Sequence, residues 1–279
     1  MKTYLRECRW GMFMLLRGDM ISQYVDMYGE WVETEVELFR TLLPHDGVCI
    51  EVGSNIGMHA VPLSRFCENG RIYCYEPQRP VFHILCGNMA LNNRLNAVVR
   101  NLAVGENPGR ISIQTGDYDE AWNYGSFSID AGFSTEAAFK GGVRSETIDI
   151  VSLDGDRELA DLARLDLIKI DAEGFEPQVL RGGRRLIGLH QPYLFVEANK
   201  AEVAEDILAE LRPRGYAAYW FLASRFRADN FNRSSFSVAG WDSNIVFCPP
   251  GRPSFEGKLM PVQDFGDLRR GVPVFSRFG

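Results

Sequence analysis

Short apolar runs alternate along this chain with longer segments in which apolar residues return every three or four positions. The runs indicate strands buried on both faces, as in a parallel sheet, and the longer segments indicate amphipathic helices. This alternation predicts an α/β fold with a doubly wound, mostly parallel sheet and helices on both faces. We expect strands over 48–52, 71–75, 97–102, 110–116, 165–170, 193–196, 216–222 and 245–248. We expect core helices over 57–66, 81–92, 177–187 and 202–211.

Three other parts of the chain depart from this pattern. Residues 1–28 mix aromatic, methionine and charged residues and predict helix with loops, and a further helix follows them. Residues 117–146 are rich in glycine and aromatic residues, which is typical of a functional loop and not of a disordered linker. We therefore expect a helical cap over 1–45, a cofactor-binding domain over 46–250, and a tail over 251–279 that packs on the domain.

A glycine-rich turn follows the first predicted strand. Residues 47–57 read G-V-C-I-E-V-G-S-N-I-G, which is an apolar run, an acid–glycine turn and the start of a helix. Glycine accepts positive φ and lets a ligand approach the backbone closely. A dinucleotide site has glycine in the middle of its fingerprint, where this chain has Asn55. The turn therefore favours a nucleoside cofactor without a diphosphate, and S-adenosylmethionine (SAM) is the clearest candidate.

A carboxylate stands at the end of the second predicted strand. In this topology Glu76 lies beside the ribose, and it can accept hydrogen bonds from both ribose hydroxyls. The end of the third strand, with Asn101 and the backbone near Ala103, is expected beside the adenine. The predicted cofactor-binding residues are Glu51, Gly53, Ser54, Asn55, Gly57, Glu76, Pro77, Asn101 and Ala103.

Composition narrows the choice of partners. The chain has 279 residues, of which 46% are hydrophobic and 24% charged, and its net charge is −7. An acidic chain without a basic stripe argues against nucleic acid, because neutralisation of phosphates supplies most of that affinity. The apolar stretch 10–16 is too short to span a bilayer, and the six cysteines form no CxxC pair. We expect a cytoplasmic protein with free thiols and no membrane span; its oligomeric state stays open, with a homodimer possible.

Five blocks of sequence form one joint pattern. They are I-E-V-G-S-N-I-G-M-H at 50–59, Y-E-P-Q at 75–78, N-L-A-V-G at 101–105, W-N-Y-G-S-F-S at 122–128 and L-D-L-I-K-I-D-A-E-G-F-E-P-Q-V-L at 165–180. With these blocks the chain resembles the FkbM family of SAM-dependent methyltransferases, although Ser54 stands where alanine is usual. The resemblance implies a class I, Rossmann-like fold with seven strands, the last one antiparallel. It also implies methylation of oxygen, often on a sugar or a polyketide.

Carboxylates gather at the predicted strand ends, at Glu51, Glu76, Asp171, Glu173 and Glu197. Right-handed crossovers bring these ends to one edge of the sheet, where ligands bind. The resulting negative mouth suits a sulfonium or a polyhydroxylated ligand. Because a hydroxyl acceptor must lose a proton, we expect Asp171 to act as general base or to orient the acceptor. Glu173 is the second candidate and Glu197 the third.

The acceptor, which we expect to be a small molecule or a glycan, has candidate contacts around this mouth. They are Glu30, Trp31, His59, Trp122, Asn123 and Tyr124, and Glu35 could also face the ligand. Asp171, Glu173 and Glu197 are hard oxygen ligands of the kind that Mg²⁺ or Ca²⁺ takes. Histidine and cysteine do not cluster as they do around a transition metal, and a required metal is not favoured.

The function expected from the sequence is SAM-dependent O-methylation of a hydroxyl on a sugar, polyketide or other natural product. An NAD-dependent oxidoreductase would share the fold and Glu76, but Asn55 counts against it. A non-catalytic SAM- or nucleoside-binding protein would keep the turn and need no base at Asp171. The identity of the acceptor, and the choice between oxygen, nitrogen and carboxyl as the methylated group, stay open.

Overall fold

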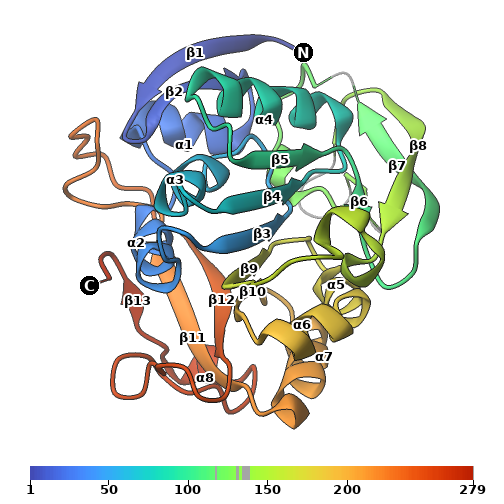
Figure 1. The fold of residues 1–279 in the computed structure, drawn as a ribbon. Coiled ribbons are helices and arrows are strands. Elements are labelled where there is room, and N and C mark those ends of the chain that lie inside the picture. Colours follow the sequence, from blue (N-terminus) through green and yellow to red (C-terminus); the bar gives the residue numbers. More distant parts are fainter. Residues whose placement is uncertain (117, 130–131, 134–138, 279) are drawn as a thin grey trace.

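An eight-stranded sheet runs through the centre of the computed structural model, which describes residues 1–116, 118–129, 132–133 and 139–278 (Figure 1). The strand order is β13-β11-β12-β10-β9-β3-β4-β5. These strands are β3 (Val48–Val52), β4 (Arg71–Tyr75), β5 (Ala97–Arg100), β9 (Leu167–Ile170), β10 (Tyr193–Glu197), β11 (Ala217–Ser224), β12 (Trp241–Cys248) and β13 (Val274–Phe275).

The pairing directions identify the sheet type. The neighbours from β5 through β4, β3 and β9 to β10 all pair in parallel, and β12 runs antiparallel to both β10 and β11. Seven strands in this order, with β12 alone reversed among them, are the sheet of a class I methyltransferase, so the predicted fold class is confirmed. The tail adds β13 as an eighth strand beside β11. A two-residue strand has no periodicity to detect, which is why the sequence did not predict it.

Helices cover both faces of the sheet and divide the interior into two cores. One face packs against α2 (Glu33–Leu42), α3 (Ala60–Phe66) and α4 (Arg79–Leu91), and the other against α5 (Glu176–Gly182), α6 (Arg184–His190) and α7 (Ala201–Leu211). In β3, Cys49 belongs to the first core and Ile50 to the second, as alternation along a strand requires. The single helix predicted over 177–187 is two helices, because the chain breaks at Gly182 and Gly183. A Cβ atom on Gly182 would lie 2.0 Å from the Gly105 carbonyl oxygen.

The N-terminal segment corrects the sequence prediction. Residues 3–16 form an antiparallel hairpin of β1 (Thr3–Cys8) and β2 (Gly11–Leu16), so helix with loops was wrong there; α1 (Met20–Tyr28) follows. Phe13 and Leu15 are buried and alternate with more exposed residues. The Asn88 side chain of α4 bonds to both backbone groups of Met14, accepting from its N–H and donating to its carbonyl. The hairpin therefore depends on α4, a partner that no local pattern reveals.

A second, three-stranded sheet lies beside the main one (Figure 1). It contains β6 (Ala103–Val104), β7 (Gly109–Gly116) and β8 (Val143–Val151). The strand predicted over 110–116 is confirmed, whereas β8 was missed because its first residues fall in the expected loop 117–146. Of that loop, residues 117, 130–131 and 134–138 lie outside the described residues. Short 3₁₀ turns are η1 (Tyr124–Ser126), η2 (Leu153–Gly155), η3 (Arg157–Leu159) and η4 (Arg212–Arg214).

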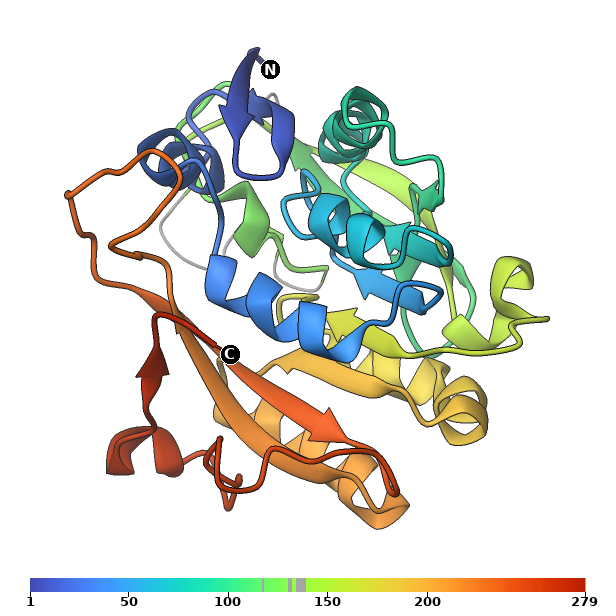
Figure 2. The ribbon, with the colours of Figure 1, turned by 60° about the vertical axis from the view of Figure 1, so that its left-hand side comes forward.

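The C-terminal third of the chain returns to the N-terminal helices and to the sheet. The loop after β11 reaches α1, where the Asn232 N–H donates to the Tyr28 carbonyl (Figure 2). In the tail, α8 (Asp267–Arg270) holds Asp267, which accepts a 3.0 Å hydrogen bond from Trp220 Nε1. All six cysteines are free thiols, as expected. Among the described residues, no helix combines the length and apolar character needed to cross a bilayer.

Candidate functional site

The glycine turn after β3 is a tight contact between two strand ends. Gly53 has φ +79°, and the N–H groups of Gly53 and Ser54 both donate to the Tyr75 carbonyl at 3.0 Å. A Cβ atom on Gly53 would lie 1.8 Å from the Asp171 carbonyl oxygen at the end of β9. The turn therefore requires glycine for its φ and for this close approach. Asn55, at φ +47°, completes a backbone that turns its amides toward the next strand.

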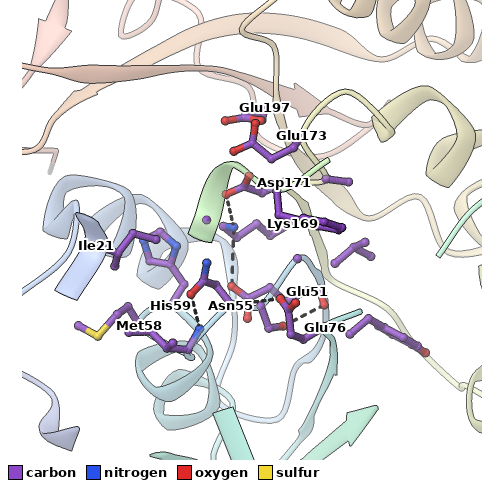
Figure 3. A pocket seen from close by; sticks show the side chains of 18 of the residues that line it. Ile21, Glu51, Asn55, Met58, His59, Glu76, Lys169, Asp171, Glu173 and Glu197 are labelled. Carbon is purple, nitrogen blue, oxygen red and sulfur yellow. Dashed lines mark hydrogen bonds and ion pairs between the residues drawn. The ribbon is translucent and has the colours of Figure 1, made fainter. Parts of the chain in front are cut away.

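Glu76 is fixed at the end of β4 by two backbone amides. Its Oε2 accepts from Asn55 N–H and its Oε1 accepts from Gln78 N–H, each at 2.9 Å (Figure 3). Each oxygen keeps a second lone pair for a ligand hydroxyl. Burial raises the pKa of Glu76 to about 7, although the two amide hydrogen bonds oppose this rise. The carboxylate is thus oriented before any ligand binds.

The ammonium group of Lys169 is buried between β9 and β3. Lys169 is 2% exposed, and its Nζ lies 3.1 Å from Asp171 Oδ2 and 3.8 Å from Glu51 Oε1 (Figure 3). Burial disfavours the charge, but Asp171, Glu51 and Glu35 outweigh that effect and raise the pKa of Lys169. Burial raises the pKa of Glu51 to about 7 against the pull of Lys169. The second Glu51 oxygen, Oε2, is buried and has no hydrogen-bond partner.

The Asp171 carboxylate also lies close to two other carboxylates, those of Glu173 and Glu197. One oxygen each from Asp171, Glu173 and Glu197 lies within 4.8 Å of the others, an arrangement whose ligand type and number could hold a divalent cation. Burial, with Glu173 and Asp171 nearby, raises the pKa of Glu197 well above its ordinary value. Glu176 is different, because it accepts from the backbone N–H groups of Ala172 and Gly174 and so shapes the turn.

Side chains from distant segments continue the wall beside Glu197, whose backbone pairs with Asn244 of β12. Trp31 precedes α2, and Arg225, just after β11, forms an ion pair with Asp242 of β12. The Arg225 guanidinium carbon lies 5.5 Å from the Trp31 ring centroid. Asn244 Nδ2 donates to Glu35 Oε1 at 3.0 Å.

These groups line one cleft at the carboxyl edge of the sheet, with about 1140 Å³ of empty space including its open mouth. Most predicted site residues lie on it: Glu51, Gly53, Ser54, Asn55, Glu76, Pro77, Ala103, Trp31, His59, Asn123, Asp171, Glu173 and Glu197. Gly57 does not line it; with φ +89°, it continues the turn toward α3. The sequence therefore pointed to this cleft mainly through the glycine turn and the strand ends.

Two other predicted residues, Asn101 and Glu30, lie outside the cleft. Asn101 Nδ2 donates to the backbone carbonyls of Glu76 and Pro77, so it supports the Glu76 turn and does not line the cleft. Glu30 is buried outside the cleft, between Arg9 and Phe231. There its Oε2 accepts from Arg9 Nε at 2.7 Å and from the Phe231 N–H at 3.0 Å.

Trp122 and Tyr124 also lie outside the cleft. Both pack into an aromatic cluster with Phe133 and Phe139. The two rings therefore pack against other aromatic side chains and do not face the cleft. Between them, Asn123 alone faces the cleft, and its Oδ1 accepts from Gly125 N–H.

Sequence reasoning missed several lining residues, among them Lys169, Gln78, Arg225, Asp242 and Asn244. Lys169 carried a signal, since it is the one charge in an otherwise apolar central strand. Arg225, Asp242 and Asn244 carried none, because Arg225 follows the end of β11 and the other two lie in the polar first half of β12, ahead of the predicted strand 245–248.

The sequence matches the model of a known protein family. The family model described as "Methyltransferase FkbM domain" matches residues 51–218, which include the turn, Glu76, Asp171 and Glu197. The chain belongs to the FkbM methyltransferase family. FkbM domains use SAM as the methyl donor, so the chain carries a SAM-dependent methyltransferase domain. The comparison with curated proteins finds no match.

Solved structures similar to this FkbM domain include other methyltransferases. Methyltransferase FkbM from Methylobacillus flagellatus is 20% identical with a TM-score of 0.47, over 75% of this chain and 47% of that one. This chain therefore spans about half the length of that protein. An O-methyltransferase from Bacillus cereus in complex with SAH is 14% identical with a TM-score of 0.44, over 77% and 80%. A SAM-dependent O-methyltransferase from Thermotoga maritima is 11% identical with a TM-score of 0.43, over 90% and 79%.

The cleft residues fit SAM on their own chemistry. Glu76 offers oriented acceptors for two hydroxyls, and the buried, unpartnered Glu51 Oε2 suits a cationic or N–H group. Gly53 lines the cleft with its backbone, because the direction of its missing Cβ is occupied by the Asp171 carbonyl. The residues that would hold the cofactor are thus already placed by the backbone of β3 and β4.

Proposed function

We propose that this FkbM domain transfers a methyl group from SAM to a hydroxyl oxygen of a sugar, a polyketide or a similar natural product. We further propose that residues 46–250 carry this activity, that residues 1–45 add part of the cleft wall, and that residues 251–279 pack on the domain. When bound, SAM supplies an electrophilic methyl group on a positively charged sulfur. The protein must place a hydroxyl in line with that methyl and receive the hydroxyl proton.

We assign the cofactor contacts along the glycine turn after β3 and the turn after β4. Gly53, Ser54 and Asn55 would surround the methionine part with Glu51, and Glu76 would bind the ribose hydroxyls. Pro77 and the backbone at Ala103 would border the adenine, since both line the same end of the cleft. Gln78 would keep this end closed, because its Nε2 donates to the Tyr124 carbonyl.

The acceptor role rests on the other half of the cleft. Asp171 stands at the end of β9 and, unlike the buried carboxylates around it, has 41% of its side chain exposed. We assign it to binding the acceptor hydroxyl as orienting group or base, with Glu173 second and Glu197 third. Trp31, His59 and Asn123 would contact the rest of the acceptor.

One observation carries the choice of a hydroxyl acceptor. The acceptor half combines the flat Trp31 ring with carboxylate and amide hydrogen-bonding groups, a set that suits a polyhydroxylated molecule. Its cations, Lys169 and Arg225, are already engaged by Asp171 and Asp242, so an anionic acceptor would meet uncompensated carboxylates. Neutral hydroxyl-rich acceptors fit this charge pattern.

Transfer of labelled methyl from SAM to a panel of sugars, macrolides, amines and carboxylic acids tests the proposal. We expect label in an ether, which resists mild base, and strongly reduced turnover in Asp171→Asn with unchanged SAM affinity. Label found in amines, or in esters released by base, would contradict the choice of oxygen. Addition of a chelator during the same assay tests the acid trio as a metal site, and we expect turnover to persist.

A further inference from the structure

A histidine–glutamate pair also faces the cleft, apart from the acid trio. His59 precedes α3 and Glu35 lies in the first turn of α2, and both line the cleft. Figure 3 shows His59 near Ile21 and Met58, apart from Asp171, Glu173 and Glu197. On the basis of the proposed hydroxyl methylation, we propose that His59 accepts the proton of the acceptor hydroxyl, that Glu35 positions its imidazole, and that Asp171 orients the acceptor.

The pair has the geometry of a base and its orienting group. Glu35 Oε2 lies 3.6 Å from His59 Nε2, and the other Glu35 oxygen, Oε1, accepts from Asn244 Nδ2 at 3.0 Å. The Phe39 ring stands edge-on to the imidazole, with centroids 5.6 Å apart, and so limits rotation of the ring. Each member of the series Asn244–Glu35–His59 thus restrains the next one.

The His59 imidazole has an unsatisfied nitrogen on the side that faces Glu35. His59 is 6% exposed, and its Nε2 is buried without a hydrogen-bond partner. Buried polar atoms without partners are uncommon, and each one calls for a structural or functional explanation. A shift of a few tenths of an ångström on acceptor binding would bring Nε2–H to Glu35 Oε2, which leaves the lone pair on Nδ1.

The surrounding charges keep the imidazole neutral and ready to accept a proton. Burial lowers the pKa of His59 well below its ordinary value, and the Lys169 ammonium acts in the same direction. Burial raises the pKa of Glu35 well above its ordinary value; Asp242 and Asp171 add to the rise, and Lys169 and Arg225 oppose it. Ionised Glu35 would stabilise the imidazolium formed during transfer, so turnover should rise with pH as Glu35 loses its proton.

The acceptor oxygen forms its new bond to the methyl carbon while its O–H proton passes to His59 Nδ1. The electron pair of the breaking S–C bond stays on sulfur, which becomes neutral. His59 becomes an imidazolium paired with the Glu35 carboxylate, and it later gives the proton to water.

Kinetics of His59→Gln and Glu35→Gln test this inference, with His45→Gln as the matched control. His45 also stands beside a glutamate, with Nε2 3.7 Å from Glu68 Oε2, but both side chains are about 60% exposed and lie outside the cleft. We expect His59→Gln to lower kcat about 100-fold or more, since general-base catalysis typically contributes 10²–10⁴-fold. SAM affinity by calorimetry should stay within about twofold, and His45→Gln should match wild type.

The pH profile separates a proton-transfer role from a structural one. In wild type we expect kcat to fall on the acid side, and in Glu35→Gln we expect that limb to flatten with kcat about tenfold lower. If His59→Gln fails to fold, an unchanged acid limb in Glu35→Gln overturns the inference. Hydroxyl methylation that continues unchanged in His59→Gln overturns this inference alone, whereas transfer to an amine in wild type overturns the proposed function with it.

Discussion

The two halves of the cleft are built in different ways. The cofactor half is made by consecutive backbone: the turn 53–57 and the turn 76–78 hold each other through amide hydrogen bonds to Tyr75 and Glu76. The acceptor half is made by side chains that lie far apart in sequence, such as Trp31, Asp171 and Arg225. Changes in the first half should therefore abolish binding of SAM, while changes in the second should alter which acceptor is used and how fast.

The largest effect should come from Gly53→Ala in the cofactor half. A Cβ atom there would collide with the Asp171 carbonyl oxygen at 1.8 Å, in addition to the strain of φ +79°. We expect loss of SAM binding together with a fall in unfolding free energy of more than about 3 kcal/mol, read by calorimetry and thermal denaturation.

Gly251→Ala is its matched control. Gly251 has a similar φ of +77°, but a Cβ atom there would meet nothing within 4 Å. Only the cost of the left-handed backbone should remain, about 1–2 kcal/mol, with SAM affinity unchanged. Equal effects of the two substitutions would show that the contact between β3 and β9 is unimportant.

Glu76→Gln should have the second-largest effect. The change removes the charge that strengthens two ligand hydrogen bonds, each worth about 1.5–3 kcal/mol, so SAM affinity should fall about 100-fold. Calorimetry with SAM measures this, and the exposed Glu205→Gln on α7 serves as control. Retention of wild-type affinity in Glu76→Gln would remove Glu76 from the cofactor site.

Trp31→Ala should separate the two halves. Loss of the ring contact should raise the KM of a hydroxyl acceptor about tenfold, while the Kd of SAM stays unchanged. The half-buried Trp10, whose Nε1 donates to Glu33 outside the cleft, offers Trp10→Ala as a comparison. A change in SAM affinity without a change in acceptor KM would place Trp31 in the wrong half.

A fall of one pH unit should change SAM affinity about as much as Trp31→Ala changes the acceptor KM. Glu76 and Glu51, each with a pKa raised by burial to about 7, bind the ligand in their ionised forms. SAM affinity should therefore be full above pH 7 and fall as pH drops below it, by about tenfold per unit for one group. Calorimetry from pH 5.5 to 8.5 measures this, and an affinity that rises toward low pH would contradict it.

Asn101→Ala should have the smallest effect. Its side chain donates to two backbone carbonyls at the Glu76 turn, and such hydrogen bonds contribute about 1 kcal/mol each. We expect a modest loss of thermal stability and a SAM affinity reduced by no more than about fivefold. A loss as large as that of Glu76→Gln would return Asn101 to a direct cofactor role.

The same contrast explains what the sequence could predict. The turn at Gly53, the acid at Glu76 and the strand ending at Asp171 are local signals of spacing and polarity, and the structure brings them to one cleft. The β1–β2 hairpin was not predicted, because it is fixed by Asn88 and Asn92 of α4 and not by its own pattern. Likewise, Arg225 reaches the cleft only through the order of β11 and β12, which is a property of the whole sheet.

Trp122 shows the converse, a local signal whose side chain lies elsewhere. An aromatic residue beside the predicted mouth suggested an acceptor contact, yet its ring packs against Phe133 and Phe139. Composition reports that aromatic rings are present, whereas their direction depends on tertiary packing.

A crystal structure with SAM, or with its demethylated product, is the most direct measurement of the central claim. We expect the ribose hydroxyls on the Glu76 carboxylate, the amino-acid part beside Gly53 and Glu51, and the sulfur turned toward the space between Asp171 and His59. Electron density for the nucleoside anywhere else, or a cleft closed by side chains in the presence of saturating SAM, would contradict it.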